Sequence, residues 1–334
     1  MNFKVGICGV GRSAQEFHIP LMRKVGKFQI VAVCDTIPSR RRMADREYHT
    51  IAFSDYRHFL DTDIDIVVIA TPSKSHFRIA KMVLDAGKHC VVEKPMAMTL
   101  REVNKLIALA KKRKVYLTVF QSRRFDGDFL TIKKILKSNL IGEPFTIESR
   151  ATSFGSLKNY GVKEFNPAWR YKKVYGGGVL YDFGSHIIDQ ILCLVEREPV
   201  SVWCDTKSVL WSREVEDYFK LLIRFRGGIT AHLEVSQVSR YNLPRWYILG
   251  TKGAVLCENG GHPIKVRTVI KGEEHERTYE LEPSYWEKFY ENFYNVLVHR
   301  AHPIVKLDEV RKAAAIIDAA YKSAHTRREE KVRF

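Results

Sequence analysis

Five short runs rich in valine and isoleucine lie within the first 120 residues of the chain, with longer amphipathic stretches between them. The runs are too short for helices, and we interpret them as strands: Lys4–Cys8, Gln29–Cys34, Ile64–Ala70, Cys90–Val92 and Val115–Phe120. Among the stretches between them, Ser75–Ala86 and Leu100–Lys112 have helical spacing, and Thr99 with Glu102 is typical of a helix cap. Strands that alternate with helices predict an α/β fold with a doubly wound parallel sheet covered on both faces.

The pattern changes after about residue 122. A predicted helix, Phe129–Ser138, precedes segments that alternate apolar with polar residues, and Gly227-Gly228 is a hairpin signal. The predicted strands are Phe145–Ala151, Ser201–Trp211, Tyr218–Arg226, Ile229–Ser236, Arg245–Leu249 and Ala254–Glu258. They indicate a C-terminal α+β domain with a large, mostly antiparallel, open sheet. A last amphipathic helix is predicted over Leu307–Ala324.

A glycine pattern directly follows the first predicted strand. Gly9, Gly11 and Ala14 form a G-x-G-x-x-A sequence that encloses Arg12 and Ser13 and opens a helix-like segment. The first glycine permits a tight turn, the second lets the backbone approach a pyrophosphate, and the alanine allows close packing. The N–H groups at the start of a helix favour an anion. The pattern therefore predicts a dinucleotide-binding domain.

The choice of dinucleotide depends on Asp35, which ends the second predicted strand 21 residues after Ala14. A carboxylate at this position accepts hydrogen bonds from the ribose 2′-hydroxyl and repels a 2′-phosphate, which favours NAD. Arg40 and its two neighbours follow closely and could clamp a phosphate or face solvent. We expect NAD as the cofactor, with NADP possible.

Two further motifs follow predicted strands. Thr71-Pro72 and His76 come after the fourth strand, and Glu93-Lys94-Pro95 comes after the fifth. Open α/β sheets bind ligands at the carboxyl ends of their strands. A surface lysine beside a turn proline is the alternative interpretation of Lys94, but its place at a strand end favours a functional role.

Three glycines, Gly176–Gly178, precede a second polar cluster that contains Asp182 and His186. If the segment from Leu180 is helical, the carboxylate and the imidazole are four residues apart and lie on one face. That pairing can orient an imidazole and tune its basicity for proton transfer, although such pairs are often only structural.

Composition excludes several classes of protein. With 45% hydrophobic and 28% charged residues the chain is globular, and it has no apolar run of the ~20 residues that a membrane helix needs. The net charge of +17 invites a nucleic-acid hypothesis, but the basic clusters are scattered through both halves. The six cysteines form no CxxC pair, so no metal site is predicted. The N-terminus lacks a signal-peptide pattern, and we expect a cytoplasmic protein.

Taken together, these motifs resemble the glucose–fructose oxidoreductase / inositol dehydrogenase (Gfo/Idh/MocA) family over nearly the whole chain. The matching features, in order, are Gly9–Ala14, Thr71-Pro72 with His76, Ala86–His89 before Glu93-Lys94-Pro95, the glycine run with Asp182, His186 and Asp189, and Gly250–Gly253. Within the family, Phe120–Asp126 and Asp128–Thr131 look most like the scyllo-inositol dehydrogenase branch. Members of that branch often use NADP and tend to lack an acidic residue where this chain has Asp35.

The resemblance implies hydride transfer between nicotinamide C4 and a secondary carbinol carbon of a polyol or sugar, without a metal. Lys94 would stabilise the reacting oxygen and His186 would be the proton acceptor, while Asp182 would orient His186 or bind a substrate hydroxyl. The residues expected to line the cofactor are Thr71, Pro72, His76, Glu93, Gln121, Trp169 and Arg170, with Arg124 on the nicotinamide or substrate side.

We expect residues 1–121 to form an NAD(P)-binding Rossmann domain and residues 122–334 a domain for substrate binding and oligomerisation. The helix at about 307–325 could pack back on the first domain. A homodimer or homotetramer through the open sheet face is the expected assembly. The alternatives are an enzyme acting on a nucleotide-linked sugar or an anhydro-ketose, and a non-catalytic dinucleotide-binding sensor or regulator.

Overall fold

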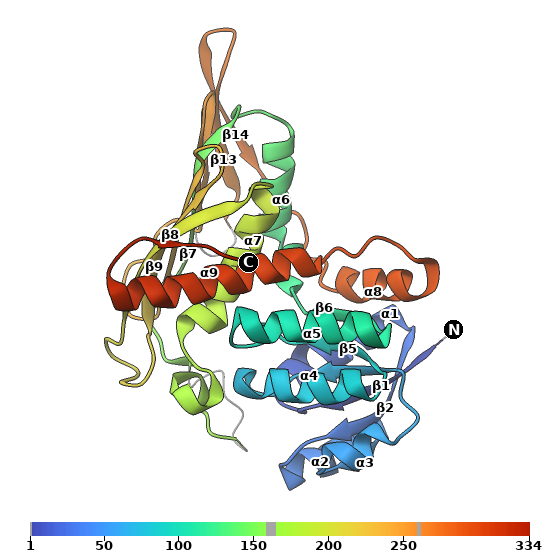
Figure 1. Ribbon diagram of the computed structural model, residues 1–334. Coiled ribbons are helices and arrows are strands. Elements are labelled where there is room, and N and C mark those ends of the chain that lie inside the picture. Colours follow the sequence, from blue (N-terminus) through green and yellow to red (C-terminus); the bar gives the residue numbers. More distant parts are fainter. Residues whose placement is uncertain (1, 158–164, 259–261) are drawn as a thin grey trace. The chain divides into compact units, whose positions relative to one another are not determined.

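The computed structural model describes residues 2–157, 165–258 and 262–334. This part of the chain divides into two compact units (Figure 1). The first unit comprises Met1–Gln121, Leu157–Gly177 and Glu287–Arg311, and the second comprises Ser122–Ser156, Gly178–Trp286 and Lys312–Phe334. Each unit contains one sheet and is described by itself.

Six parallel strands form the sheet of the first unit, in the order β3-β2-β1-β4-β5-β6. They are β1 (Phe3–Cys8), β2 (Phe28–Cys34), β3 (Ile51–Phe53), β4 (Ile66–Ile69), β5 (His89–Val92) and β6 (Leu117–Val119). The order of strands is that of a Rossmann sheet, with its switch point between β1 and β4. The doubly wound parallel sheet predicted from the sequence is confirmed.

Helices lie between these strands in the chain, and α4 and α5 lie side by side (Figure 1). Apart from short 3₁₀ turns, the described helices of the unit are the π-helical η1 (Ala14–His18), α1 (Ile19–Val25), α2 (Pro38–Tyr48), α3 (Tyr56–Leu60), α4 (His76–Asp85), α5 (Leu100–Arg113) and α8 (Lys288–His299). Thr99 caps α5 as predicted, because its hydroxyl accepts a hydrogen bond from the Glu102 N–H at 3.2 Å. All four residues of β4 are buried, as expected of a strand inside a covered parallel sheet.

Nine strands form the sheet of the second unit, in the order β14-β13-β12-β11-β7-β10-β9-β8-β15. They are β7 (Pro144–Thr152), β8 (Pro199–Lys207), β9 (Tyr218–Phe225), β10 (Thr230–Ser236), β11 (Trp246–Gly250), β12 (Gly253–Cys257), β13 (Ile264–Ile270), β14 (Glu273–Tyr279) and β15 (Glu330–Lys331). Within the described residues of this unit, only β7 and β10 pair in parallel, so the large, mostly antiparallel sheet is also confirmed.

Three longer helices accompany this second sheet in the chain: α6 (Gly127–Lys137), α7 (Ser185–Leu194) and α9 (Leu307–Thr326). The helix α7 is preceded by a π-helical turn, η7 (Leu180–Gly184), and contacts β7 and β10. Strand β9 alternates buried with more exposed residues, so one face of the sheet packs on helices and the other is open.

One predicted strand is wrong at its end. The sequence predicts a strand over Ser201–Trp211, but β8 ends at Lys207. The carboxylate of Asp217 accepts hydrogen bonds from the backbone N–H groups of Val209, Leu210 and Trp211 at 2.7–2.8 Å, and this folds the segment into a loop. In the described ranges, no helix combines the length with the apolar character that crossing a membrane would require.

Candidate active site

The predicted cofactor residues of the first unit gather at one edge of its sheet. Because all six strands are parallel, their carboxyl ends share that edge. The glycine turn follows β1, Asp35 follows β2, Thr71 follows β4, Glu93 follows β5 and Gln121 follows β6. Tertiary structure thus brings together residues that are more than 100 positions apart in the sequence.

The glycine turn after β1 is close to the end of β4. Gly9 has φ +86°, and a Cβ there would lie 2.8 Å from the Ala70 carbonyl oxygen, so only glycine fits. Ala14 is fully buried and begins η1, in keeping with the close packing predicted for it. Arg12 is partly exposed and pairs with Glu16 at 2.6 Å.

Asp35 is buried and holds the local backbone. Its two carboxylate oxygens accept hydrogen bonds from the N–H groups of Val10 and Ile37, each at 2.8 Å. The guanidinium of Arg40 lies 3.6 Å from the Asp35 carboxylate and 3.4 Å from the position of a Cβ built on Gly11. Of the two roles considered for Arg40, the solvent-facing one is excluded, because its side chain is only 10% exposed.

Glu93 is the acceptor of a partly buried hydrogen-bond cluster. Its Oε1 accepts from the Ser13 hydroxyl and from His18 Nε2, and its Oε2 accepts from the Lys94 N–H at 3.0 Å. Burial by itself would raise the pKa of Glu93, but the hydrogen bond and charge of His18, with Lys94 and Ser13, lower the pKa to about 2. The carboxylate is therefore ionised beside Lys94 at neutral pH.

His76 joins the two strand-end motifs. Its Nδ1 lies 2.7 Å from the Pro95 carbonyl oxygen and its Nε2 lies 2.8 Å from that of Thr71. The imidazole is 1% exposed, and this burial lowers its pKa even though both carbonyl groups act to raise it. His76 thus fixes the backbone that follows β4 against the backbone that follows β5, and a cis peptide bond joins Lys94 to Pro95.

The segment that carries Trp169 and Arg170 packs on the same motifs. At Gly176, an added Cβ would lie 2.8 Å from Met98 Sδ and 3.0 Å from the Lys74 backbone nitrogen. The guanidinium of Arg170 stacks over the Trp169 ring at 4.3 Å. The glycine run therefore allows this segment to approach the strand-end loops closely.

Two buried polar atoms in the first unit have no hydrogen-bond partner within the described ranges: Arg40 Nε and Gln121 Oε1. Gln121 is 4% exposed and lies two residues after the end of β6. Buried polar atoms are usually satisfied in native proteins, so each of these is a candidate for contact with a ligand.

In the second unit, Asp182 and His186 belong to consecutive helical elements, and the shared face expected for them stays a prediction. Asp182 lies in the π-helical η7, and His186 lies in the first turn of α7 and is 9% exposed. The Phe183 ring makes an edge contact with the imidazole at 6.1 Å, and Arg123 stacks over Phe183 at 4.9 Å. A direct interaction between Asp182 and His186 stays a prediction.

The start of this helical segment is held by Glu216. Its Oε1 accepts hydrogen bonds from the Leu180 N–H and the Tyr321 hydroxyl, both at 2.9 Å. Gly178 has φ +111°, and a Cβ there would lie 2.4 Å from the same carboxylate oxygen. Burial raises the pKa of Glu216. This explains one of the three glycines by a close approach within the protein.

Arg124 forms a buried ion pair within the second unit. Its guanidinium makes a bidentate ion pair with Asp189, with Nε to Oδ2 at 2.7 Å and Nη2 to Oδ1 at 2.5 Å, and both side chains are almost fully buried. The pair joins η3 (Ser122–Phe125) to α7, one turn after His186. Contact of Arg124 with a nicotinamide or a substrate stays a prediction.

The sequence interpretation missed His18, Tyr290 and Glu216. His18 is 75 residues from Glu93 and 272 from Tyr290, so no local pattern indicates their contact. The sequence offers one signal, a histidine five residues after Ser13. It indicates that both side chains reach the same group only when η1 is known to be π-helical.

Comparison with known proteins agrees with both folds. The family model GFO_IDH_MocA, described as an oxidoreductase family with an NAD-binding Rossmann fold, matches residues 3–121, and the GFO/IDH/MocA C-terminal domain model matches residues 129–256. The uncharacterized oxidoreductase YdgJ of Escherichia coli is 34% identical over 67% of this chain and 62% of its own length, so the chain spans less than two thirds of that relative.

Two further relatives are matched over a larger share of their own length. The scyllo-inositol 2-dehydrogenase (NADP(+)) IolW of Bacillus subtilis is 33% identical over 75% of this chain and 67% of its own length. The crystal structure of an NAD-binding protein from Listeria innocua has a TM-score of 0.88 and 31% identity, and covers 99% of this chain and 97% of that one. The chain therefore belongs to the GFO/IDH/MocA family of oxidoreductases, with an NAD-binding Rossmann fold in its N-terminal part.

Proposed function

We propose that this protein is an NAD(P)-dependent dehydrogenase of an inositol-like polyol or a sugar, acting on a secondary alcohol or the corresponding ketone. The observation that carries the proposal is the cluster at the strand ends of the first unit, where Lys94 adjoins an ionised Glu93 next to the glycine turn. The name of the relative IolW supports the substrate class.

The residues present suit a dinucleotide. The turn of Gly9 and Gly11 opens a helix whose N–H groups favour a pyrophosphate. The unpaired Nε of Arg40 lies on the side of Asp35, where the adenosine ribose belongs. The unpaired Oε1 of Gln121, at the end of β6, can accept a hydrogen bond from a carboxamide.

In the proposed mechanism, His186 accepts the proton of the substrate hydroxyl during oxidation and returns it in the reverse direction. Lys94 donates a hydrogen bond to the same oxygen and stabilises the negative charge that develops there. Asp182 orients the imidazole or binds a neighbouring hydroxyl. The nicotinamide, when bound, supplies the acceptor for the hydride.

For cofactor preference we propose NAD first, with NADP accepted more weakly. The carboxylate of Asp35 opposes a 2′-phosphate, and each of its oxygens retains a lone pair for a ribose hydroxyl after bonding to Val10 and Ile37. The guanidinium of Arg40, close beside it, reduces that repulsion.

A substrate screen tests the function directly. Reduction of NAD and of NADP would be followed at 340 nm over inositols, hexoses, sugar acids and nucleotide-linked sugars. We expect the highest kcat/KM with an inositol or hexose and NAD. Turnover only with nucleotide-linked sugars would favour the alternative substrate, and cofactor binding without turnover of any alcohol would contradict the proposal.

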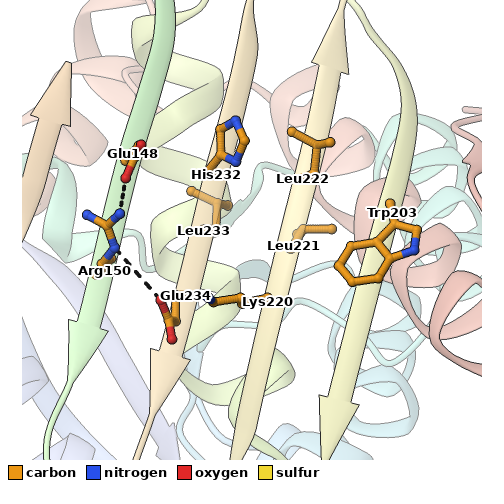
Figure 2. A pocket seen from close by; sticks show the side chains of 9 residues that line it. All are labelled: Glu148, Arg150, Trp203, Lys220, Leu221, Leu222, His232, Leu233 and Glu234. Atoms are coloured by element: carbon orange, nitrogen blue, oxygen red, sulfur yellow. Dashed lines mark hydrogen bonds and ion pairs between the residues drawn. The ribbon is translucent and has the colours of Figure 1, made fainter. Parts of the chain in front are cut away.

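We also propose that a second copy of the chain covers the open sheet face of the second unit. Figure 2 shows side chains that line a pocket on this face. The strand register places Trp203, Leu222 and His232 in one cross-strand row and Lys220, Glu234 and Arg150 in the next row on the same face. The Trp203 side chain is 42% exposed, which is unusual for so large an apolar ring.

The charges on this face match those of a second copy of the same face. One register row reads Asp205, Lys220, Glu234 and Arg150 across β8, β9, β10 and β7, so its charges alternate in sign. If a twofold axis reverses the row, every charge faces its opposite in the second copy, which is the requirement of an isologous interface. The row therefore favours a homodimer over an unrelated partner.

A further inference from the structure

We propose that His18 is a positioning residue for the reaction: it holds the Glu93 carboxylate and thereby the backbone of Lys94 at the end of β5. The proposal deepens the proposed function, because it rests on the catalytic role given to Lys94. His18 lies in the first unit together with every group that it contacts.

The helical geometry of η1 explains why His18 can reach Glu93. Ser13 and His18 are five residues apart, and five residues make about 1.4 turns of an α-helix, which would point the two side chains in different directions. In a π-helix the hydrogen bonds run from i to i+5, and the Ile19 N–H bonds to the Ala14 carbonyl in this way. Both side chains consequently reach Glu93 Oε1.

The imidazole of His18 is fixed by two hydrogen bonds and a ring contact. It is 0% exposed, its ring lies 4.3 Å from the Phe120 ring, and its Nδ1 lies 2.6 Å from the Tyr290 hydroxyl. Its Nε2 lies 3.1 Å from Glu93 Oε1. An ionised carboxylate can only accept, so the proton between them is on Nε2. His18 thus connects α8, through Tyr290, to the strand end that carries Lys94.

The carboxylate passes this restraint on to Lys94. Glu93 Oε2 accepts from the Lys94 N–H at 3.0 Å, so the orientation of the carboxylate sets the plane of the peptide from which the lysine side chain departs. A reacting group displaced by about 1 Å can lose ~10²-fold in rate. Loss of the His18 hydrogen bond should therefore affect the chemical step more than cofactor binding.

Two isosteric variants separate positioning from packing. In His18→Gln the amide nitrogen takes the place of Nε2 and keeps the donor to Glu93. In His18→Asn the side chain reaches only the place of Nδ1, so it keeps the contact with Tyr290 and loses Glu93. We expect kcat of His18→Asn to fall ~10²-fold with KM for NAD little changed, and His18→Gln to recover most of the loss.

Amide hydrogen exchange of the Glu93–Lys94 segment gives a readout that needs no substrate. We expect faster exchange in His18→Asn than in His18→Gln, at similar melting temperatures. Equal kcat losses in both variants, or an effect confined to melting temperature or to KM for NAD, would overturn the proposal. Full turnover by Lys94→Met would refute the catalytic role of Lys94 and with it the positioning role of His18. Failure of the wild type to turn over any alcohol would instead refute the proposed function, and the exchange measurement would still test whether His18 restrains the Glu93–Lys94 segment.

Discussion

The two sheets of this protein place their polar groups differently. In the six-stranded parallel sheet, β4 is buried along its whole length, and the polar side chains predicted to bind the cofactor come after the strands, as Asp35, Glu93 and Gln121 do. In the nine-stranded sheet, buried residues of β9 alternate with more exposed ones, and charged groups such as Lys220 lie on an open face. A sheet covered on both sides can carry chemistry only at its ends, whereas an open sheet can use its face for association.

The largest expected effect is a loss of kcat on substitution of Lys94, which follows β5. Lys94→Met should lower kcat by ~10²–10⁴-fold, because the group that stabilises the reacting oxygen is lost, and leave NAD affinity close to that of the wild type. Stopped-flow turnover and fluorescence titration of NAD measure the two quantities. Lys74→Met, which removes an exposed lysine after β4, is the matched control and should retain turnover. Unchanged kcat in Lys94→Met would break the assignment of chemistry to this edge.

The second prediction compares a buried ion pair with one on the open face. Asp189→Leu should destabilise the protein by about 3–5 kcal/mol, because it leaves the Arg124 guanidinium buried without its carboxylate. The double variant Arg124→Met/Asp189→Leu should recover much of this. Lys220→Met, which breaks the pair with Glu234 on the open face, should cost less than about 1 kcal/mol. Urea unfolding measures all three, and equal costs would show that the face is as enclosed as the interior.

A third prediction addresses the open face as an interface. Leu222→Asp should weaken self-association by ~10–100-fold, because a dimer would bury an unpaired carboxylate from each copy. Sedimentation velocity over a range of concentrations measures the equilibrium. Val269→Asp, at an exposed apolar position on β13, is the control. A wild type that stays monomeric at high concentration would contradict the interface.

The smallest effect concerns cofactor preference. Asp35→Ser should raise the kcat/KM ratio of NADP to NAD by ~10-fold, equivalent to about 1.4 kcal/mol, because the charge that opposes the 2′-phosphate is removed. Adding Arg40→Met should reverse the gain. Asp45→Ser removes the same charge from an exposed position on α2 and should leave the ratio unchanged. If the ratio does not change in Asp35→Ser, residues other than Asp35 determine the cofactor preference.

Sequence patterns predicted the elements whose signals are local. The Val- and Ile-rich strands, the Thr99 cap and the glycine turn all depend on neighbours within a few residues. The hairpin β13–β14 was missed because β14 is exposed on nearly all its residues and so lacks an apolar face. Its turn residues Lys271 and Gly272 both have positive φ, as in a type I′ turn, and cross-strand pairing supplies the rest.

Helices α2 and α8 were missed for different reasons. Three consecutive arginines dominate the start of α2, so its apolar face is too weak to be read as a periodic pattern. In α8, the aromatic residues Phe289, Tyr290 and Phe293 are buried, and their stabilisation comes from packing on distant rings such as Phe28. These aromatic residues recur at helical spacing, so the sequence does carry an amphipathic signal for α8, and the sequence interpretation did not use it.

The amino-acid sequence by itself determined the dinucleotide turn, the order of the strand-end motifs and the family, because these depend on residue type at short spacing. Only the tertiary structure decided what the polar residues touch: Asp35 bonds to Val10, His76 bridges two loops, and His18 reaches Glu93. The physical reason is that a hydrogen bond needs atoms within about 3 Å. Chain folding, which brings residues 18, 93 and 290 together, sets that distance.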